Sequence, residues 1–218
     1  MRTERPRALL LRQKGRSYSE ISKSLSVPKS TVADWLGKIP WSINVKEHLT
    51  QEARELQRVR IRTMNAVRGE RLARLYAEAA EEARREFSAL KRSPLFITGI
   101  SLYWGEGDKA SKHLVRLGNT DPIMMGIFVD FLKMTCNIPQ SKIRAYILLY
   151  PDLDPKKCLS LWVRSSGLSR KNFNKSIIIQ GRHKSRRVPY GVCSVTVNSS
   201  YLKVKINTWL QLLPKSLN

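Results

Sequence analysis

Acidic side chains are scarce in this sequence. It holds 17 Asp and Glu against 40 Lys and Arg in 218 residues, which gives a formal net charge of +23 and an isoelectric point near 10.5. A charge this far from zero points to a polyanionic partner, and the simplest such partner is nucleic acid. We therefore expect a nucleic acid as the ligand and no small-molecule substrate.

Cysteine and histidine are also rare. The three cysteines are far apart, odd in number and without a CxxC pair, so we expect reduced thiols and no zinc site. The three histidines show no metal-binding spacing with one another. This pattern argues against nuclease sites of the His-Cys and HNH kinds.

Long apolar runs are missing as well. No stretch of about 18 apolar residues is long enough to cross a bilayer, and the first residues, MRTERPRALL, do not read as a signal peptide. We expect a soluble cytoplasmic protein with no membrane partner, associated with the nucleoid, from a prokaryotic, archaeal or phage source.

One apolar stretch in the middle of the chain, Leu95 to Asp108 (LFITGISLYWGEGD), organises the rest. Ser93 can cap a helix that has Pro94 at its first position, and glycines 105 and 107 can end it. A helix this apolar must be buried on nearly every side, by its own domain and by a second copy of the chain. Tyr103 and Trp104, beside Glu106, are expected to lie in the core; the alternative is that they stack on bases.

One stripe of this helix predicts a dimer interface. Ile97, Ser101 and Gly105 follow one another at i, i+4 and i+8, with Thr98 beside them, and small residues let a second backbone approach closely. Glu106 ends the helix, where the macrodipole disfavours an acid, so stability does not explain its position.

These residues resemble the signature of the LAGLIDADG homing-endonuclease family, with SLYWGEG at residues 101–107 matching the family's GLIDADG. Ser101 stands where the family has glycine, Trp104 where the first Asp often is, and Glu106 where the second acid is. The resemblance implies two such helices side by side, each delivering a metal-binding acid to a DNA-binding saddle. Because the chain holds a single motif, it also implies a homodimer.

The chemistry implied by the resemblance is phosphodiester hydrolysis with Mg²⁺ or another divalent cation such as Mn²⁺, since Mg²⁺ prefers oxygen ligands and keeps most of its water. Glu106 is the candidate metal ligand and catalytic acid. Asp108 is either a second catalytic acid or a turn residue. A basic residue near the scissile phosphate is also implied, and the candidates are Lys175, Arg182 and Lys184.

The segment after the central helix alternates strands and helices: strands near 112–118, 142–150, 176–180 and 191–198, and helices near 122–134, 155–165 and 200–213. This order resembles the αββαββα module of the same family, with a saddle-shaped mixed or antiparallel sheet. Two departures stand out: the first strand must be very short or absent, and helix 155–165 is an addition. The basic residues expected to line the saddle are Arg116, Arg144, Arg182, Lys184, Arg186 and Arg187.

Residues 6–38 predict a helix-turn-helix. Ser17 and Glu20 form a capping box for its second helix, and the stretch YSEISKSLSVPKSTVADWL resembles the motif of resolvase-like and repressor-like proteins. Its third helix would enter the major groove with Lys29, Ser30, Thr31 and Asp34 facing outward. Arg12, Lys14, Lys23 and Lys38 are alternatives for phosphate contacts.

The sequence thus predicts an α+β protein of three parts: a helix-turn-helix domain (1–40), a basic helical linker (41–92) and a LAGLIDADG-like endonuclease domain (93–218). The linker is either two helices or one helix with a weak point at Gly69. Two functions stay open. One is a homodimeric, metal-dependent, site-specific DNA endonuclease of homing type; the other is a DNA-binding transcriptional regulator that uses the same fold without cutting.

Overall fold

The computed structural model describes residues 3–179 and 188–216. The chain divides into two compact units, residues 1–71 and residues 72–218. The first unit is helical, and the second combines helices with a mixed four-stranded sheet. The protein is therefore of the α+β class.

The first unit is built from α1 (Arg5–Gln13), α2 (Tyr18–Leu25), α3 (Lys29–Leu36) and the beginning of α4 (Pro40–Leu90). The predicted capping box is confirmed: Glu20 N donates to Ser17 Oγ at 3.2 Å, and Ser17 N donates to the Glu20 carboxylate at 2.8 Å. Short apolar side chains form a small core between the helices, namely Ala8, Ile21, Val27, Val32 and Leu36.

Arg12 corrects one expectation for this unit. Its side chain is only 1% exposed, and its guanidinium donates to Ser42 Oγ (3.1 Å), Ser42 O (2.6 Å) and Arg16 O (2.8 Å). Burial lowers the pKa of Arg12, and the neighbouring Tyr18 offsets part of that effect. Arg12 therefore ties α1 to α4 and is not available to a phosphate.

The predicted linker is one continuous helix, α4, without a break at Gly69. Its last turns belong to the second unit, where Ala79, Ala83 and Phe87 are buried. The ammonium group of Lys205 binds Glu82 and Glu86 of α4 at 2.7 Å each. The end of α4 is thus part of the fold that follows it.

The sheet of the second unit contains β1 (Leu114–Asn119), β2 (Ile143–Leu149), β3 (Ile177–Ile178) and β4 (Val192–Asn198) in the order β1-β4-β2-β3. β4 is antiparallel to both of its neighbours, and β3 is parallel to β2. The strand before β1, which the sequence predicts to be very short or absent, is a single bridge between Gly107 and Leu117.

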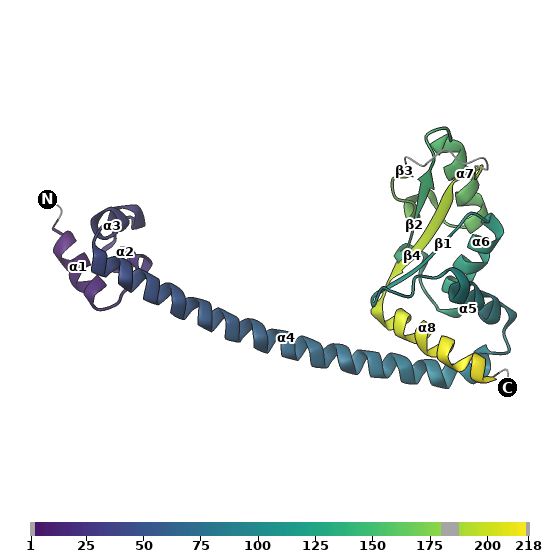
Figure 1. Ribbon diagram of the computed structural model, residues 1–218, viewed down its shortest axis with the longest axis horizontal. Helices are drawn as coiled ribbons and strands as arrows, with labels where there is room; N and C mark the ends of the chain where they lie inside the picture. Colours follow the sequence, from purple (N-terminus) through teal and green to yellow (C-terminus); the bar gives the residue numbers. More distant parts are fainter. Residues whose placement is uncertain (1–2, 180–187, 217–218) are drawn as a thin grey trace. The chain divides into compact units, whose positions relative to one another are not determined.

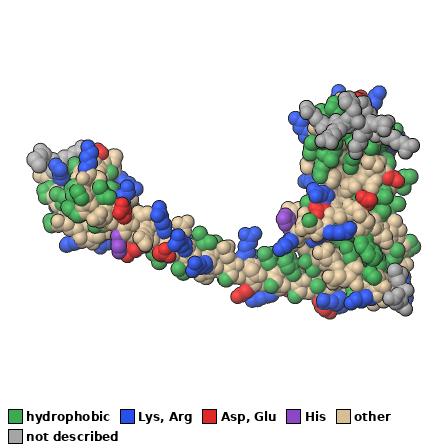
Figure 2. Space-filling model, viewed as in Figure 1, with side chains coloured by type: hydrophobic (Ala, Val, Ile, Leu, Met, Phe, Trp, Pro, Cys, Tyr) green, Lys and Arg blue, Asp and Glu red, His purple; other side chains and the backbone are tan. Residues whose placement is uncertain are grey.

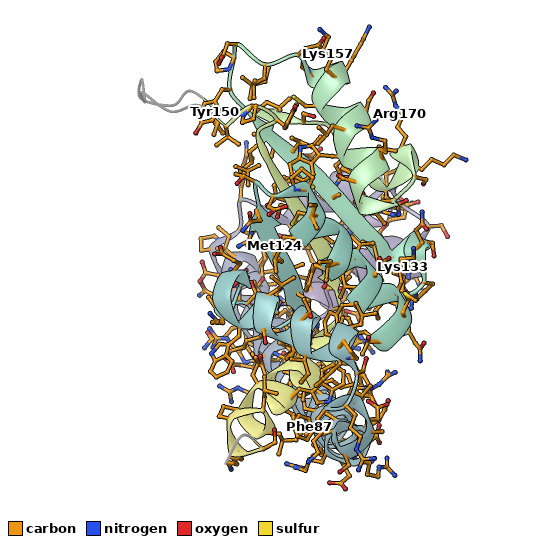
Figure 3. All side chains as sticks on the ribbon, turned by 90° about the vertical axis from the view of Figure 1, so that its right-hand side faces the viewer. Phe87, Met124, Lys133, Tyr150, Lys157 and Arg170 are labelled. Carbon is orange, nitrogen blue, oxygen red and sulfur yellow. The ribbon has the colours of Figure 1, made fainter. Side chains whose placement is uncertain are left out.

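Helices cover one face of this sheet (Figures 1 and 3). The layer consists of α5 (Pro94–Glu106), α6 (Pro122–Asp130), α7 (Pro155–Ser166) and α8 (Ser200–Leu212). α6 continues as a π-helical turn, Phe131–Thr135, and single 3-10 turns lie at Gln140–Lys142, Arg170–Asn172 and Pro214–Ser216. The predicted cap of α5 is confirmed, because Ser93 Oγ accepts from Phe96 N. α6 is capped by the Asp121 carboxylate, which accepts from Ile123 N.

The added helix has a topological role. β2, α7 and β3 form a crossover that lays β3 parallel to β2 at the edge of the sheet. Asn172 fastens this addition, because its amide donates to Gln140 O at 2.7 Å and to Ile143 O at 2.9 Å. The addition therefore widens the sheet by one short strand.

The central helix α5 is less enclosed than its composition predicts. Phe96, Ile100 and Tyr103 are buried, but the Trp104 side chain is 45% exposed, so its assignment to the core was wrong. On the buried side of α5, the Tyr103 ring stacks on the Phe128 ring of α6, with 6.2 Å between the ring centres. The opposite side of α5 is open to solvent in a single chain.

Candidate nucleic-acid interface

The face of the sheet away from the helices is open and carries basic side chains. Along β1, β2 and β4 the residues that face the helices are buried, and the alternate residues are largely exposed or half-buried. The strand register places Arg116, Thr196 and Arg144 side by side in one row across this open face. Strands separated by 28 and 52 residues in the sequence thus bring two predicted DNA-binding arginines together.

Both arginines are partly anchored and still exposed. The Arg144 guanidinium donates to Ser141 O at 2.9 Å, and that of Arg116 forms an ion pair of 2.8 Å with Asp108. Such contacts fix the position of a guanidinium while leaving some of its five N–H groups available to a phosphate or a base edge.

Glu106 lies at the end of α5, next to this basic face. The following residue, Gly107, pairs with Leu117 of β1, one residue from Arg116. The Glu106 side chain is exposed, and among residues 3–179 and 188–216 its carboxylate has no hydrogen bond or ion pair. The Glu106 carboxylate can therefore supply oxygen ligands to a metal ion beside a cationic surface.

Asp108 has the geometry of a turn residue. Its carboxylate accepts hydrogen bonds from Ala110 N (2.9 Å), Ser111 N (3.2 Å) and Ser111 Oγ (3.0 Å), in addition to Arg116. These contacts, led by the Ser111 backbone amide, lower the pKa of Asp108. Of the two roles that the sequence left open for Asp108, the geometry matches the turn.

A buried lysine supports the same turn from behind. Lys203 of α8 is 1% exposed, and its ammonium group donates to the Tyr103 hydroxyl at 2.6 Å and to the Asp108 carbonyl oxygen. Burial lowers the pKa of Lys203, and burial together with the charge of Asp108 raises that of Tyr103 to about 12. Sequence reasoning missed this contact, for which the only signal is a lysine between the core residues Leu202 and Ile206.

Lys175 lies far from Glu106 within one chain. Its neighbour Asn174 donates to Ala145 O of β2, on the β3 side of the sheet, whereas Gly107 borders β1 at the other edge. Four strand spacings separate the two segments, about 19 Å. The structure therefore does not bring Lys175 to the acid of its own chain.

Four other residues predicted to bind DNA lie outside the described residues: Arg182, Lys184, Arg186 and Arg187.

In the first unit, Lys29, Ser30 and Asp34 of α3 are exposed and Thr31 is half-buried. Of these, Ser30 and Asp34 lie on the side of α3 opposite Val32 and Leu36, which belong to the core.

The stripe predicted as a dimer interface is exposed in a single chain. Thr98, Ser101 and Gly105 are open to solvent and Ile97 is half-buried. Space for a second backbone exists at Gly105, because a Cβ atom added there would meet no atom within 4 Å. By contrast, Gly99 on the other side of α5 lies directly against the Phe131 ring.

A divalent metal fits the chemistry of this end of α5 only in part. No group of three or more His, Cys, Asp or Glu side chains that could hold a metal ion occurs in the described part of the chain. Glu106 offers one carboxylate, a suitable ligand for Mg²⁺. A complete set of ligands would need oxygen atoms from outside one chain.

Comparison with models of known protein families gives no match, and neither does comparison with curated proteins or with solved structures. None of the helices within residues 3–179 and 188–216 has both the length and the apolar character needed to span a bilayer. Figure 2 shows basic side chains outnumbering acidic ones on the visible surface of both units.

Proposed function

We propose that this protein is a homodimeric, site-specific endonuclease that binds double-stranded DNA on the open face of its sheet. The observation that carries the proposal is the row Arg116–Thr196–Arg144, which ends one residue from the bridge formed by Gly107. The row therefore begins, at Arg116 on β1, beside the segment that carries the carboxylate of Glu106.

The roles of the residues follow from their surroundings. Arg116 and Arg144 bind the phosphate backbone or base edges of the duplex. Tyr103 and Lys203 hold the main chain of Asp108, and so fix the turn that follows Glu106. Glu106 from each subunit would hold Mg²⁺ or Mn²⁺, which neutralises charge on the phosphate and activates water for hydrolysis when bound.

Dimerisation through α5 supplies the second acid. The Ile97–Ser101–Gly105 stripe is exposed and lacks bulk at Gly105, so two copies of α5 can approach closely along it. A bulky substitution, Gly105→Leu, should leave the single chain folded and lower the fraction of dimer measured by light scattering. Gly69→Leu, in exposed α4, is the matched control.

Cleavage is the direct test. The full chain is incubated with a duplex selected from a random pool, with and without Mg²⁺. We expect Mg²⁺-dependent cleavage that Glu106→Gln abolishes while binding persists. Asp130→Asn removes another exposed acid, in the helical layer, and should change neither property.

The alternative is a DNA-binding regulator without nuclease activity. The observation that favours it is the first unit, whose α3 presents Lys29, Ser30 and Asp34 on a small independent core, a set that suits major-groove binding by itself. Specific binding without any metal-dependent cleavage would support the regulator, and absence of duplex binding would contradict both functions.

A further inference from the structure

The open face of the sheet changes character along the strands. Next to the arginine row lies a row of Gly118, Ser194 and Tyr146, and beyond it the register aligns Val192, Leu148 and Ile177. We call this last set the apolar row. Ile177 is 49% exposed, and Leu148 and Val192 are half-buried.

The apolar row lies on a sheet surface that faces solvent, and covering it with a binding partner would remove apolar area from water. Single exposed apolar residues are common on proteins, but here three from three strands lie side by side. The nearest polar row is neutral and the next one is basic. A partner that covers this face must therefore combine negative charge with apolar groups.

Charge narrows the choice of partner further. Residues 155–218, which include β3 and β4, hold 13 Lys and Arg and no Asp or Glu. A second copy of this face would place arginines against arginines. The major groove of DNA meets both requirements, because it is lined by phosphates and exposes the C5-methyl group of thymine, which apolar side chains recognise.

The spacing of the rows matches base-pair steps. Arg144 and Leu148 are four residues apart on β2, about 13 Å, and base pairs are stacked about 3.4 Å apart. A strand lying along the groove would thus place the apolar row about four base pairs from the arginine row.

We propose that Leu148, Ile177 and Val192 are specificity-determining residues that contact thymine methyl groups about four base pairs from the bases or phosphates bound by Arg116 and Arg144. This inference rests on the proposed binding of duplex DNA to the sheet. The inference adds the chemical group that is recognised, the thymine methyl group, and the three side chains that contact it.

Replacing thymine by uracil tests the proposal, because uracil lacks the C5-methyl group and keeps the same pairing edge. In the selected duplex, each thymine is replaced in turn and the Kd of the full chain is measured at fixed salt. One buried methyl group predicts about a fourfold weaker binding at one or two adjacent positions.

The variants locate the effect on the protein. In Leu148→Ala and Ile177→Ala, thymine and uracil duplexes should bind equally at those positions. Ile123→Ala is the control, because Ile123 is 74% exposed on α6 in the helical layer; it should keep the fourfold difference. Because the Kd values for thymine and uracil duplexes are compared within each variant, a general loss of stability would affect both values equally.

Three outcomes would overturn the inference. Uracil has no effect at any position, or its effect persists in both alanine variants, while duplex binding stays intact. Alternatively, Ile177→Lys dissociates the protein in the absence of DNA, which would make the apolar row a protein interface. Failure of the full chain to bind any duplex would instead contradict the proposed function itself.

Discussion

The ammonium group of Lys203 donates a 2.6 Å hydrogen bond to the hydroxyl of Tyr103, and both groups bind the carbonyl oxygen of Asp108. Two segments about 100 residues apart in the sequence, residues 103–108 and the beginning of α8, meet there. Buried lysines are rare because the charge loses its water, so this one marks a point where the fold holds a turn in place.

Lys203→Met should therefore destabilise the second unit. Removing a charged donor from a buried hydrogen-bond network costs about 1–3 kcal/mol, and urea denaturation followed by circular dichroism measures the change. Lys215→Met, at an exposed position of the same C-terminal region, should change the free energy of unfolding by less than about 0.5 kcal/mol. Equal effects of the two variants would contradict the role of Lys203.

Two glycines predict opposite effects of the same substitution. A Cβ atom at Gly99 would lie 2.2 Å from the Phe131 ring, whereas one at Gly69 would meet nothing within 4 Å. We expect Gly99→Ala to destabilise its unit by about 2 kcal/mol or more. Gly69→Ala should stabilise α4 by about 0.5–1 kcal/mol; a thermal melt of each variant decides, and a neutral Gly99→Ala would contradict the close packing of α5.

The contact between α4 and α8 should make stability depend on pH. The hydrogen bonds from Lys205 and then Tyr201 lower the pKa of Glu82 from 4.5 to about 2. Because the folded state binds a proton more weakly than the unfolded state, this contribution is complete above pH 4.5 and is lost as the pH falls from 4.5 towards 2.

Glu82→Gln removes that contribution. Since the Glu82 side chain is 37% exposed, solvent screening limits the loss at neutral pH to about 1 kcal/mol. Unfolding free energies of the two proteins, measured by urea titration, should converge between pH 4.5 and 2. A constant difference over this range would show that the Glu82 carboxylate is not the group that titrates.

The position of positive charge, and not only its amount, should control DNA binding by the sheet. The double variant Arg116→Gln, Arg144→Gln removes two contacts and should lower the slope of log K against log salt by about 2. Lys156→Gln with Lys157→Gln removes the same charge from α7, in the helical layer, where Lys157 points outward in Figure 3. Equal losses for both pairs, measured by fluorescence anisotropy, would favour nonspecific attraction by the whole protein.

The sequence determined the local structure of this protein and the sign of its charge. The caps at Ser17, Ser93 and Asp121 were predictable because each bond spans at most three residues, and the helices and strands after residue 93 follow from periodicity. The excess of Lys and Arg favours a polyanionic partner whatever the fold, because the net charge follows from composition alone.

Only the tertiary structure decided which side chains share a surface. The row of Arg116, Thr196 and Arg144 depends on pairing between distant strands, and hydrophobic periodicity does not fix which strands pair. Packing also buried Arg12 and Lys203 and left Trp104 exposed. These outcomes depend on contacts across the whole unit, where the free energy of burying one face against another outweighs the preference of any single residue.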